Sequence, residues 1–175
     1  NFRRLLGGFV EVCDERSLDE MYRIIAKDMD WLAEDRFGNY MVQIFIERGY
    51  TPGIERFTDL IKKRLNHILF DKYSRFPLIK LLIKYPDHGL AHLILFRLSK
   101  DPPLLSKVLS KHQTIHMLLL VVSNSKEASH LETFHRALAP WKESQSVFPS
   151  ADALSTFDHW YSRLYNSICR PSDKI

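Results

Sequence analysis

The chain contains little cysteine and no long apolar run. Its two cysteines, Cys13 and Cys169, lie far apart among helix-forming residues, so they provide no disulfide framework and favour a reducing compartment, the cytoplasm or the nucleus. No window approaches the roughly 18 consecutive apolar residues of a membrane span. Segment 1–8 is too short in its apolar part for a signal peptide. We therefore expect no association with a membrane.

Catalytic and metal-binding motifs are also missing. The sequence contains no glycine-rich phosphate loop, no nucleophile elbow and no paired-carboxylate motif. His112 and His116 have the i, i+4 spacing of zinc ligands, but no carboxylate or cysteine nearby completes the set, and His130 and His135 are no better. We predict a binding module without enzymatic activity, metal or cofactor.

The composition is that of a folded chain with a modest basic excess. Of the 175 residues, 45% are hydrophobic and 26% are charged, which is typical of globular proteins. The net charge of +4 and the isoelectric point near 9.1 permit a polyanionic partner, although a solvated basic face would give the same values. The chain begins with Asn1 rather than methionine, so we expect it to be a fragment or a processed form.

Apolar residues recur at helical spacing along most of the chain, and no segment shows the alternation of a strand. Ser17 and Glu20 form a capping-box pattern that predicts a helix starting near residue 18. Further helices are predicted over 54–65, 77–84, 90–98 and 104–109. The predicted fold class is all-α.

The sequence repeats with a period of 36 residues. This offset superimposes Val42 on Leu78 and Phe45 on Leu81, and it also matches turn and charge positions, which chance coincidence between helices does not explain. The offset superimposes a further apolar set, Ile24, Leu60 and Phe96. A fourth unit starts three residues late, at Lys111. A period between 20 and 50 residues predicts a solenoid in which each unit packs on its neighbours.

One segment resembles a repeat of the Pumilio (PUF) RNA-binding proteins. It reads Leu-Ala-Glu-Asp-Arg-Phe-Gly-Asn-Tyr-Met-Val-Gln over residues 32–43 and continues with Ile-Glu-Arg-Gly over 46–49. The resemblance implies a right-handed α-helical repeat solenoid of three-helix units of about 36 residues. We expect three to four units over 1–138, the first one partial, then a loop over 139–151 and a C-terminal capping helix over 152–169.

In that family an Asn-Tyr-x-x-Gln arrangement implies a uracil contact, which assigns Asn39 and Gln43 to the base edge and Tyr40 to stacking. Two amides four residues apart lie on one helix face, where their donors and acceptors can meet one base. The alternative is that Asn39 caps a helix and Tyr40 packs internally. The same positions in the neighbouring units hold Arg3, Arg4 and Gly7, then Arg75, Phe76 and Ile79. Side chains that could hydrogen-bond to a base edge are therefore complete only in the unit that contains Asn39 and Gln43.

Stacking groups are better preserved than edge-reading groups. Arg4, Tyr40 and Phe76 each carry a planar group at equal spacing, which predicts a column that stacks on bases. Arg3 and Arg75 stand beside this column as further candidates for RNA contacts. The pattern predicts a surface that binds single-stranded RNA with little sequence choice.

Two groups of basic residues are predicted to differ in role. Arg36 and Lys72 each precede a helix that carries predicted base contacts, so both can approach phosphates. Segment 62–64 is instead expected on a solvated outer face. The family resemblance implies binding of uridine-containing single-stranded RNA and post-transcriptional control of messenger RNA, through its stability or its translation.

The alternative function is a protein-protein interaction scaffold built from a degenerate PUF-like repeat. Because the chain starts inside a unit, further repeats or a partner protein are expected to cover its N-terminal end. The aromatic residues of the C-terminal part are expected to fill the core of a cap rather than to form a recognition patch. They are Trp141, Phe148, Phe157, Trp160 and Tyr161.

Overall fold

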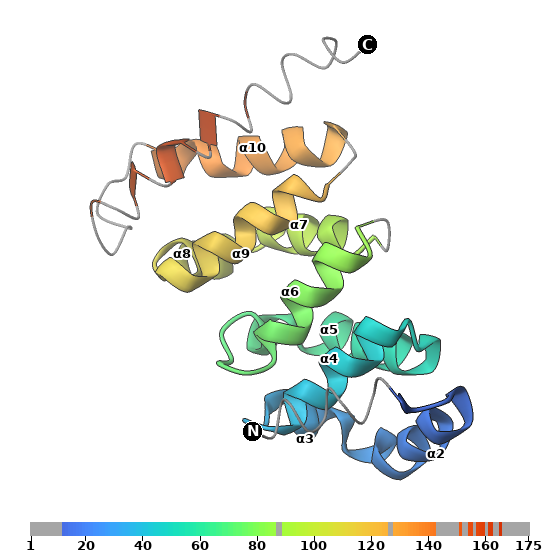
Figure 1. Ribbon diagram of the computed structural model, residues 1–175. Coiled ribbons are helices and arrows are strands. Elements are labelled where there is room, and N and C mark those ends of the chain that lie inside the picture. Colours follow the sequence, from blue (N-terminus) through green and yellow to red (C-terminus); the bar gives the residue numbers. More distant parts are fainter. Residues whose placement is uncertain are drawn as a thin grey trace. The chain divides into compact units, whose positions relative to one another are not determined.

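The computed structural model describes residues 12–86, 89–125 and 128–142, and single residues between 151 and 165. These residues form helices and turns, and no strand occurs among them, so the all-α prediction is confirmed (Figure 1). The chain divides into two compact units, Asn1–Tyr85 and Pro86–Ile175. Over the described ranges, no helix is both long and apolar enough to cross a bilayer.

The first unit contains α2 (Glu15–Ile25), the 3-10 helix η1 (Ala26–Asp28), α3 (Met29–Glu34), α4 (Gly38–Arg48), α5 (Thr51–Ile68) and α6 (Arg75–Lys84). The capping box predicted for α2 is wrong. The helix starts earlier because the carboxylate of Asp14 accepts a hydrogen bond of 2.8 Å from the backbone N–H of Ser17. Within α5, Arg64 has φ −125° and ψ 28°, and this kink separates a long helical piece from a short one.

The second unit contains α7 (Leu90–Lys100), α8 (Pro102–Leu109), α9 (His112–Ser123) and α10 (Ala128–Lys142). The loop predicted to start at residue 139 is contradicted, because α10 continues to Lys142 despite Pro140. Leu138 is fully buried and Trp141 is half-buried, so the apolar stripe of the helix extends past the proline and stabilises the last turn by packing. Residues 143–150 lie outside the described part.

Helices of one kind recur at nearly constant spacing. The helices α4, α6 and α9 start at residues 38, 75 and 112, which are 37 residues apart each time. Their matched apolar positions are buried in the first unit, as the fully enclosed Val42, Leu78, Phe45 and Leu81 show. The described elements therefore repeat in order and spacing, and their assembly into a PUF-like solenoid stays a prediction.

The 36-residue register does not extend into the helices that follow. Leu60 is buried, but the residues superimposed on it, Ile24 and Phe96, are 72% and 50% exposed. The connection between α4 and α5 consists of residues 49–50, whereas residues 85–89 separate α6 from α7. The predicted equivalence of these three core positions is therefore wrong, because only Leu60 is buried.

An aromatic cluster packs α2, α4 and α5 together in the first unit. The ring of Phe45 lies 5.8 Å from that of Tyr22 and 5.4 Å from that of Tyr50, centroid to centroid. Tyr50 donates a 2.6 Å hydrogen bond to the carboxylate of Asp19. Burial and this hydrogen bond to an anion raise the pKa of Tyr50 to about 12.

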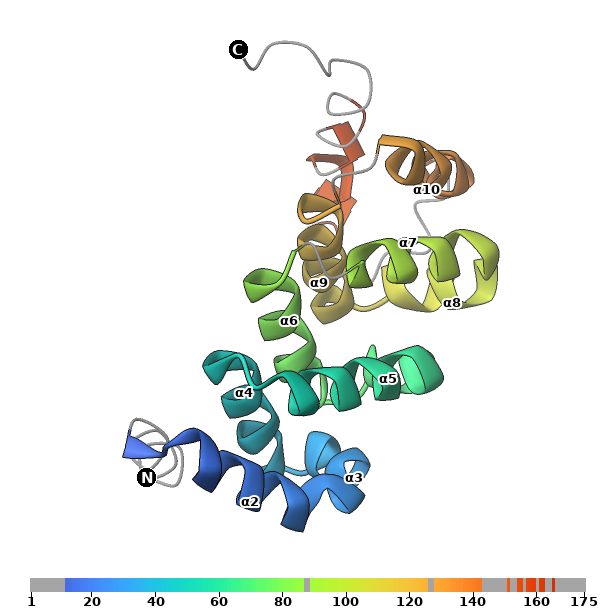
Figure 2. The same cartoon turned by 90° about the vertical axis from the view of Figure 1, so that its right-hand side faces the viewer.

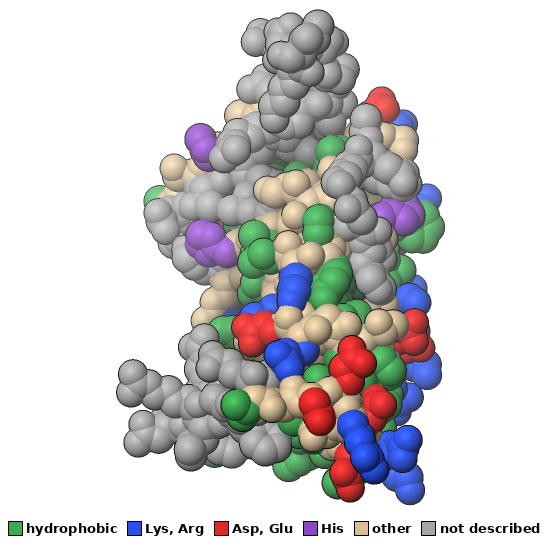
Figure 3. All heavy atoms as spheres, turned by 45° about the vertical axis from the view of Figure 1, so that its right-hand side comes forward, with side chains coloured by type: hydrophobic (Ala, Val, Ile, Leu, Met, Phe, Trp, Pro, Cys, Tyr) green, Lys and Arg blue, Asp and Glu red, His purple; other side chains and the backbone are tan. Residues whose placement is uncertain are grey.

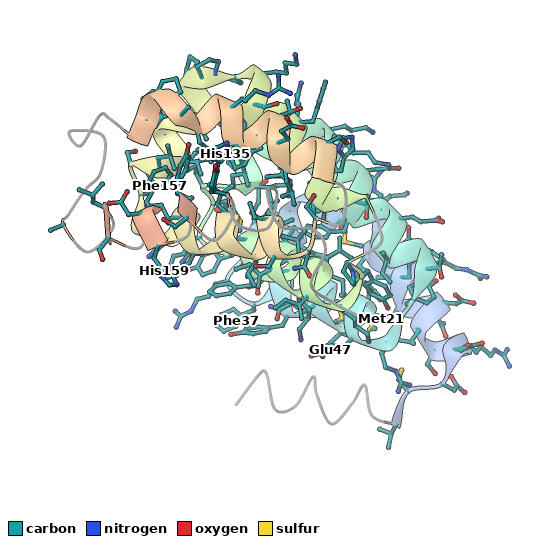
Figure 4. The ribbon with its side chains drawn as sticks, turned by 90° about the horizontal axis from the view of Figure 1, so that it is seen from above. Met21, Phe37, Glu47, His135, Phe157 and His159 are labelled. Carbon is teal, nitrogen blue, oxygen red and sulfur yellow. The ribbon has the colours of Figure 1, made fainter. Side chains whose placement is uncertain are left out.

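The described residues within 152–169 are helical and pack on α10. Phe157 is fully buried and Tyr161 is 8% exposed. The Tyr161 ring stacks on that of His135 with centroids 4.6 Å apart, and Figure 4 labels His135 and Phe157. The predicted core-filling role is confirmed for these two aromatic residues. Phe148 and Trp160 lie outside the described residues.

Candidate nucleic-acid interface

The helices α4 and α6 lie side by side and run in the same direction. Figures 1 and 2 both show them as neighbours, and side-chain contacts join their C-terminal ends. Tyr85 donates a 3.2 Å hydrogen bond to the carbonyl oxygen of Ile46, while Lys80 and Lys84 bind the carboxylate and the carbonyl oxygen of Glu47. Because these C-terminal ends meet, the N-terminal ends of α4 and α6 lie together at the opposite end of the pair. Packed helix axes are about 8–10 Å apart.

An aspartate fixes the backbone ahead of each of these helices. We call residues 35–38 and 71–74 the lead-in segments of α4 and α6. Asp35 Oδ1 accepts hydrogen bonds from the backbone N–H groups of Phe37 at 2.8 Å and Gly38 at 2.7 Å. Asp71 Oδ1 accepts from the corresponding groups of Tyr73 at 3.0 Å and Ser74 at 2.7 Å. The same turn therefore recurs 36 residues later, and it holds both segments in one backbone conformation.

These bonds also perturb the two carboxyl groups. The N–H groups of Gly38 and Phe37 lower the pKa of Asp35 below its ordinary value. Burial pushes the pKa of Asp71 upward, but the hydrogen bonds from the backbone and hydroxyl of Ser74 and from Tyr73 outweigh it, so that pKa is lowered as well. Both aspartates are thus held ionised in the folded protein.

Each lead-in segment presents a cation beside an aromatic ring. The guanidinium of Arg36 lies 5.3 Å from the ring centroid of Phe37, and the ammonium of Lys72 lies 5.4 Å from that of Tyr73. Phe37 is 48% exposed, and Figure 4 labels it at the start of α4. Arg36 and Lys72 are exposed, as the phosphate role predicted for them requires. Whether they contact phosphates stays a prediction.

A third pair of this kind begins α6. The guanidinium of Arg75 lies 5.4 Å from the ring centroid of Phe76, and that ring is 46% exposed. Tyr40, the predicted stacking residue of α4, is half-buried. Two members of the predicted stacking column, Tyr40 and Phe76, thus lie on neighbouring helices, while Arg4 and also Arg3 lie outside the described residues.

The side chain of Asn39 is turned into the protein. It is 2% exposed, and its amide nitrogen donates to the carbonyl oxygens of Asp35 at 2.8 Å and Arg36 at 2.9 Å. Its amide oxygen accepts a 2.9 Å hydrogen bond from Gln43. The base-edge contact predicted for Asn39 is incompatible with this arrangement, because the backbone ahead of the helix already occupies both amide hydrogens. Gln43 is half-buried and its amide is tethered to Asn39.

A buried polar side chain near the start of α9 also hydrogen-bonds to the backbone ahead of its helix. Thr114 is the third residue of α9, and it is 3% exposed. Its hydroxyl donates to the carbonyl oxygens of Val108 and, at 2.8 Å, Lys111, both of which precede α9. A small polar side chain at this position therefore closes the backbone turn ahead of its helix. The helix-cap alternative for Asn39 is also wrong, because Phe37 is the N-cap residue of α4 and the Asn39 amide donates to carbonyl oxygens instead of accepting from N–H groups.

The basic residues of α5 lie in a mixed-charge surface. Lys62 is 3.3 Å from Asp59, Arg56 is 3.8 Å from Asp30, and Arg64 is 2.9 Å from Glu34, measured between nitrogen and oxygen. Figure 3 shows basic and acidic side chains interspersed on one face of the protein. The expectation of a solvated outer face for segment 62–64 agrees with these contacts, whose exposed ion pairs add little to stability.

Sequence reasoning missed Phe37 and Tyr73 as candidate contact residues. A signal was present, because Arg36-Phe37 and Lys72-Tyr73 are both cation-aromatic dipeptides and are 36 residues apart. In the described ranges no group of three or more histidine, cysteine, aspartate or glutamate side chains could hold a metal ion.

Comparison of the chain with protein-family models, with curated proteins and with solved structures finds no match.

Proposed function

We propose that the chain binds single-stranded RNA through the neighbouring N-terminal parts of α4 and α6. One observation carries this proposal: cations lie beside exposed or half-buried aromatic rings just ahead of or at the start of two parallel helices that pack against each other. Aromatic faces stack on bases, and cations bind phosphates, which together are the chemistry of single-strand recognition. With the family resemblance, this supports a role in post-transcriptional control of messenger RNA, in the cytoplasm or the nucleus.

A fluorescence anisotropy titration with uridine-rich and random single-stranded RNA at low salt tests the proposal. We expect Phe76→Ala and Tyr40→Ala to weaken binding by about 1–3 kcal/mol each, the usual contribution of one stacked base. Ile83→Ala is the matched control, because Ile83 is 59% exposed near the C-terminal end of α6. Equal affinities of all four proteins would reject the proposed surface.

The salt dependence of the same titration provides a second measure. If Arg36, Lys72 and Arg75 each neutralise one phosphate, the logarithm of the affinity falls against the logarithm of salt concentration with a slope of about −2. Lys62→Ala, on the mixed-charge surface of α5, is expected to leave this slope unchanged. A slope near zero for the unmodified protein would contradict phosphate binding.

The second candidate is a protein-interaction scaffold, and a specific observation favours it. Ile24 and Trp31 are 72% and 65% exposed on α2 and α3 of the first unit, and large exposed apolar side chains are common at protein interfaces. Absence of RNA binding at low salt would favour this function.

A further inference from the structure

The groups presented by the lead-in segments recognise features that all nucleotides share. An aromatic ring stacks on any base, and a guanidinium or ammonium group binds a phosphate whatever the base or the sugar. The amide that would read a base edge is bonded within the protein, since Asn39 donates to Asp35 and Arg36 and accepts from Gln43. At the same position α6 carries the cation Arg75.

We propose that the lead-in segments bind single-stranded RNA or DNA with little preference for the base. Phe37 and Tyr73 stack on bases, and Arg36 and Lys72 contact the flanking phosphates. This inference rests on the proposed function and changes it in two respects. It moves the main stacking contacts from Tyr40 and Phe76 to Phe37 and Tyr73, which lie ahead of the helices, and it removes the expected preference for uridine.

The geometry of the first unit favours two contacts with one strand. The parallel packing of α4 and α6 brings the two lead-in segments to the same end of the helix pair. Asp35 and Asp71 hold both segments in the same turn through hydrogen bonds of 2.7–3.0 Å to the backbone. Little ordering of the backbone is therefore needed when the strand binds.

The carboxylates near this surface are bonded to groups other than Arg36 and Lys72. The carboxylates of Asp35 and Asp71 are turned to the backbone N–H groups of their own segments. Glu34, which precedes the first lead-in segment, forms an ion pair with Arg64 at 2.9 Å and lies 3.2 Å from the imidazole nitrogen of His67. Arg36 and Lys72 are exposed, whereas Asp35 and Asp71 are half-buried.

Anisotropy titrations with four labelled strands of equal length test the inference: oligo-U and oligo-C RNA, and oligo-dT and oligo-dC DNA. We expect dissociation constants within about threefold of one another, because a specific base-edge contact would produce about five- to 150-fold discrimination. Phe37→Ala and Tyr73→Ala are each expected to weaken binding of all four strands about tenfold. Ile83→Ala is expected to change none of them.

Because Tyr73 is partly buried, Tyr73→Ala could weaken binding by destabilising the fold. Variants of the exposed Arg36 and Lys72 avoid this problem. We expect Arg36→Ala and Lys72→Ala each to reduce the magnitude of the salt slope by about 0.7 for every strand. If oligo-U RNA binds more than tenfold tighter than the other strands, the proposed lack of base preference is wrong, but the proposed binding of RNA is supported. If unmodified protein binds RNA but the lead-in variants bind equally well, the assignment of these residues is overturned. If no strand binds at low salt, the proposed function itself fails.

Discussion

Replacement of Gly38 by alanine tests the close approach that sets the first lead-in segment. Gly38 is the first residue of α4 and is buried. A Cβ atom built there would lie 2.7 Å from the carbonyl oxygen of Leu32, 2.9 Å from its Cα and 2.8 Å from its Cδ2. Two of these three atoms belong to the backbone of α3, so a change of side-chain rotamer cannot relieve the contact.

The magnitude follows from two opposing contributions. Gly to Ala gains up to about 1 kcal/mol of helix propensity in a helix interior, and less at the first residue. Forcing an extra carbon into packed backbone costs about 1–3 kcal/mol. We therefore expect Gly38→Ala to lower the free energy of unfolding by about 1–2 kcal/mol and to weaken strand binding, because α4 must shift away from α3.

Urea unfolding followed by circular dichroism measures the stability of Gly38→Ala, with Leu32→Ala and the double variant as controls. Removing the Leu32 side chain eliminates only the Cδ2 contact, so Leu32→Ala is expected not to rescue Gly38→Ala. The destabilisation caused by Gly38→Ala should then largely persist in the Leu32→Ala background, with the coupling limited to the lost Cδ2 contact. A Gly38→Ala protein as stable as the unmodified chain, or a double variant restored to the stability of Leu32→Ala, would refute the reasoning.

Three further predictions concern the aspartate turns and the aromatic cluster. Asp71→Ala should lower the free energy of unfolding by about 1–2 kcal/mol in urea titrations, and Asp71→Asn by less, because the amide oxygen still accepts the backbone hydrogen bonds. Since the pKa values of Asp35 and Asp71 are lowered by folding, their stabilisation is complete above about pH 4 and is lost as the pH falls through the folded values. Thermal melts across the acid range check this, and unchanged melting below pH 4 would contradict it. Folding raises the pKa of Tyr50 to about 12, so its stabilisation is present below about pH 10 and is lost as the pH rises through 12. In ultraviolet titrations Asp19→Ala should lower that pKa only in part, since burial is the larger cause.

Much of the fold follows from local patterns in the sequence. The helices over 54–65, 77–84, 90–98 and 104–109 were predicted from apolar spacing, and each lies within an observed helix. Their ends were less predictable. The start of α2 depends on a hydrogen bond to Asp14, and the end of α10 depends on packing of Leu138 and Trp141 around a proline.

The candidate interface was predicted only in part. The period of 36 residues correctly aligned Arg36 with Lys72 and Asp35 with Asp71, and both pairs occupy equivalent turns. The role of Asn39 was not predictable from helical spacing, which places its Cβ on a helix face but does not determine where its amide bonds. The turn ahead of α4 determines that, because it brings the carbonyl oxygens of Asp35 and Arg36 within hydrogen-bond distance of the amide.

By itself, the sequence determined the helices, their period and the recurrence of cation-aromatic dipeptides, because these depend on residue types at fixed separations along one chain. Only the tertiary structure decided which of those residues face outward. Packing α4 against α6 placed the two lead-in segments together, and hydrogen bonds in the turn removed Asn39 from the surface. These outcomes depend on contacts between helices and on competition for backbone acceptors, and neither is encoded in the spacing of a single helix.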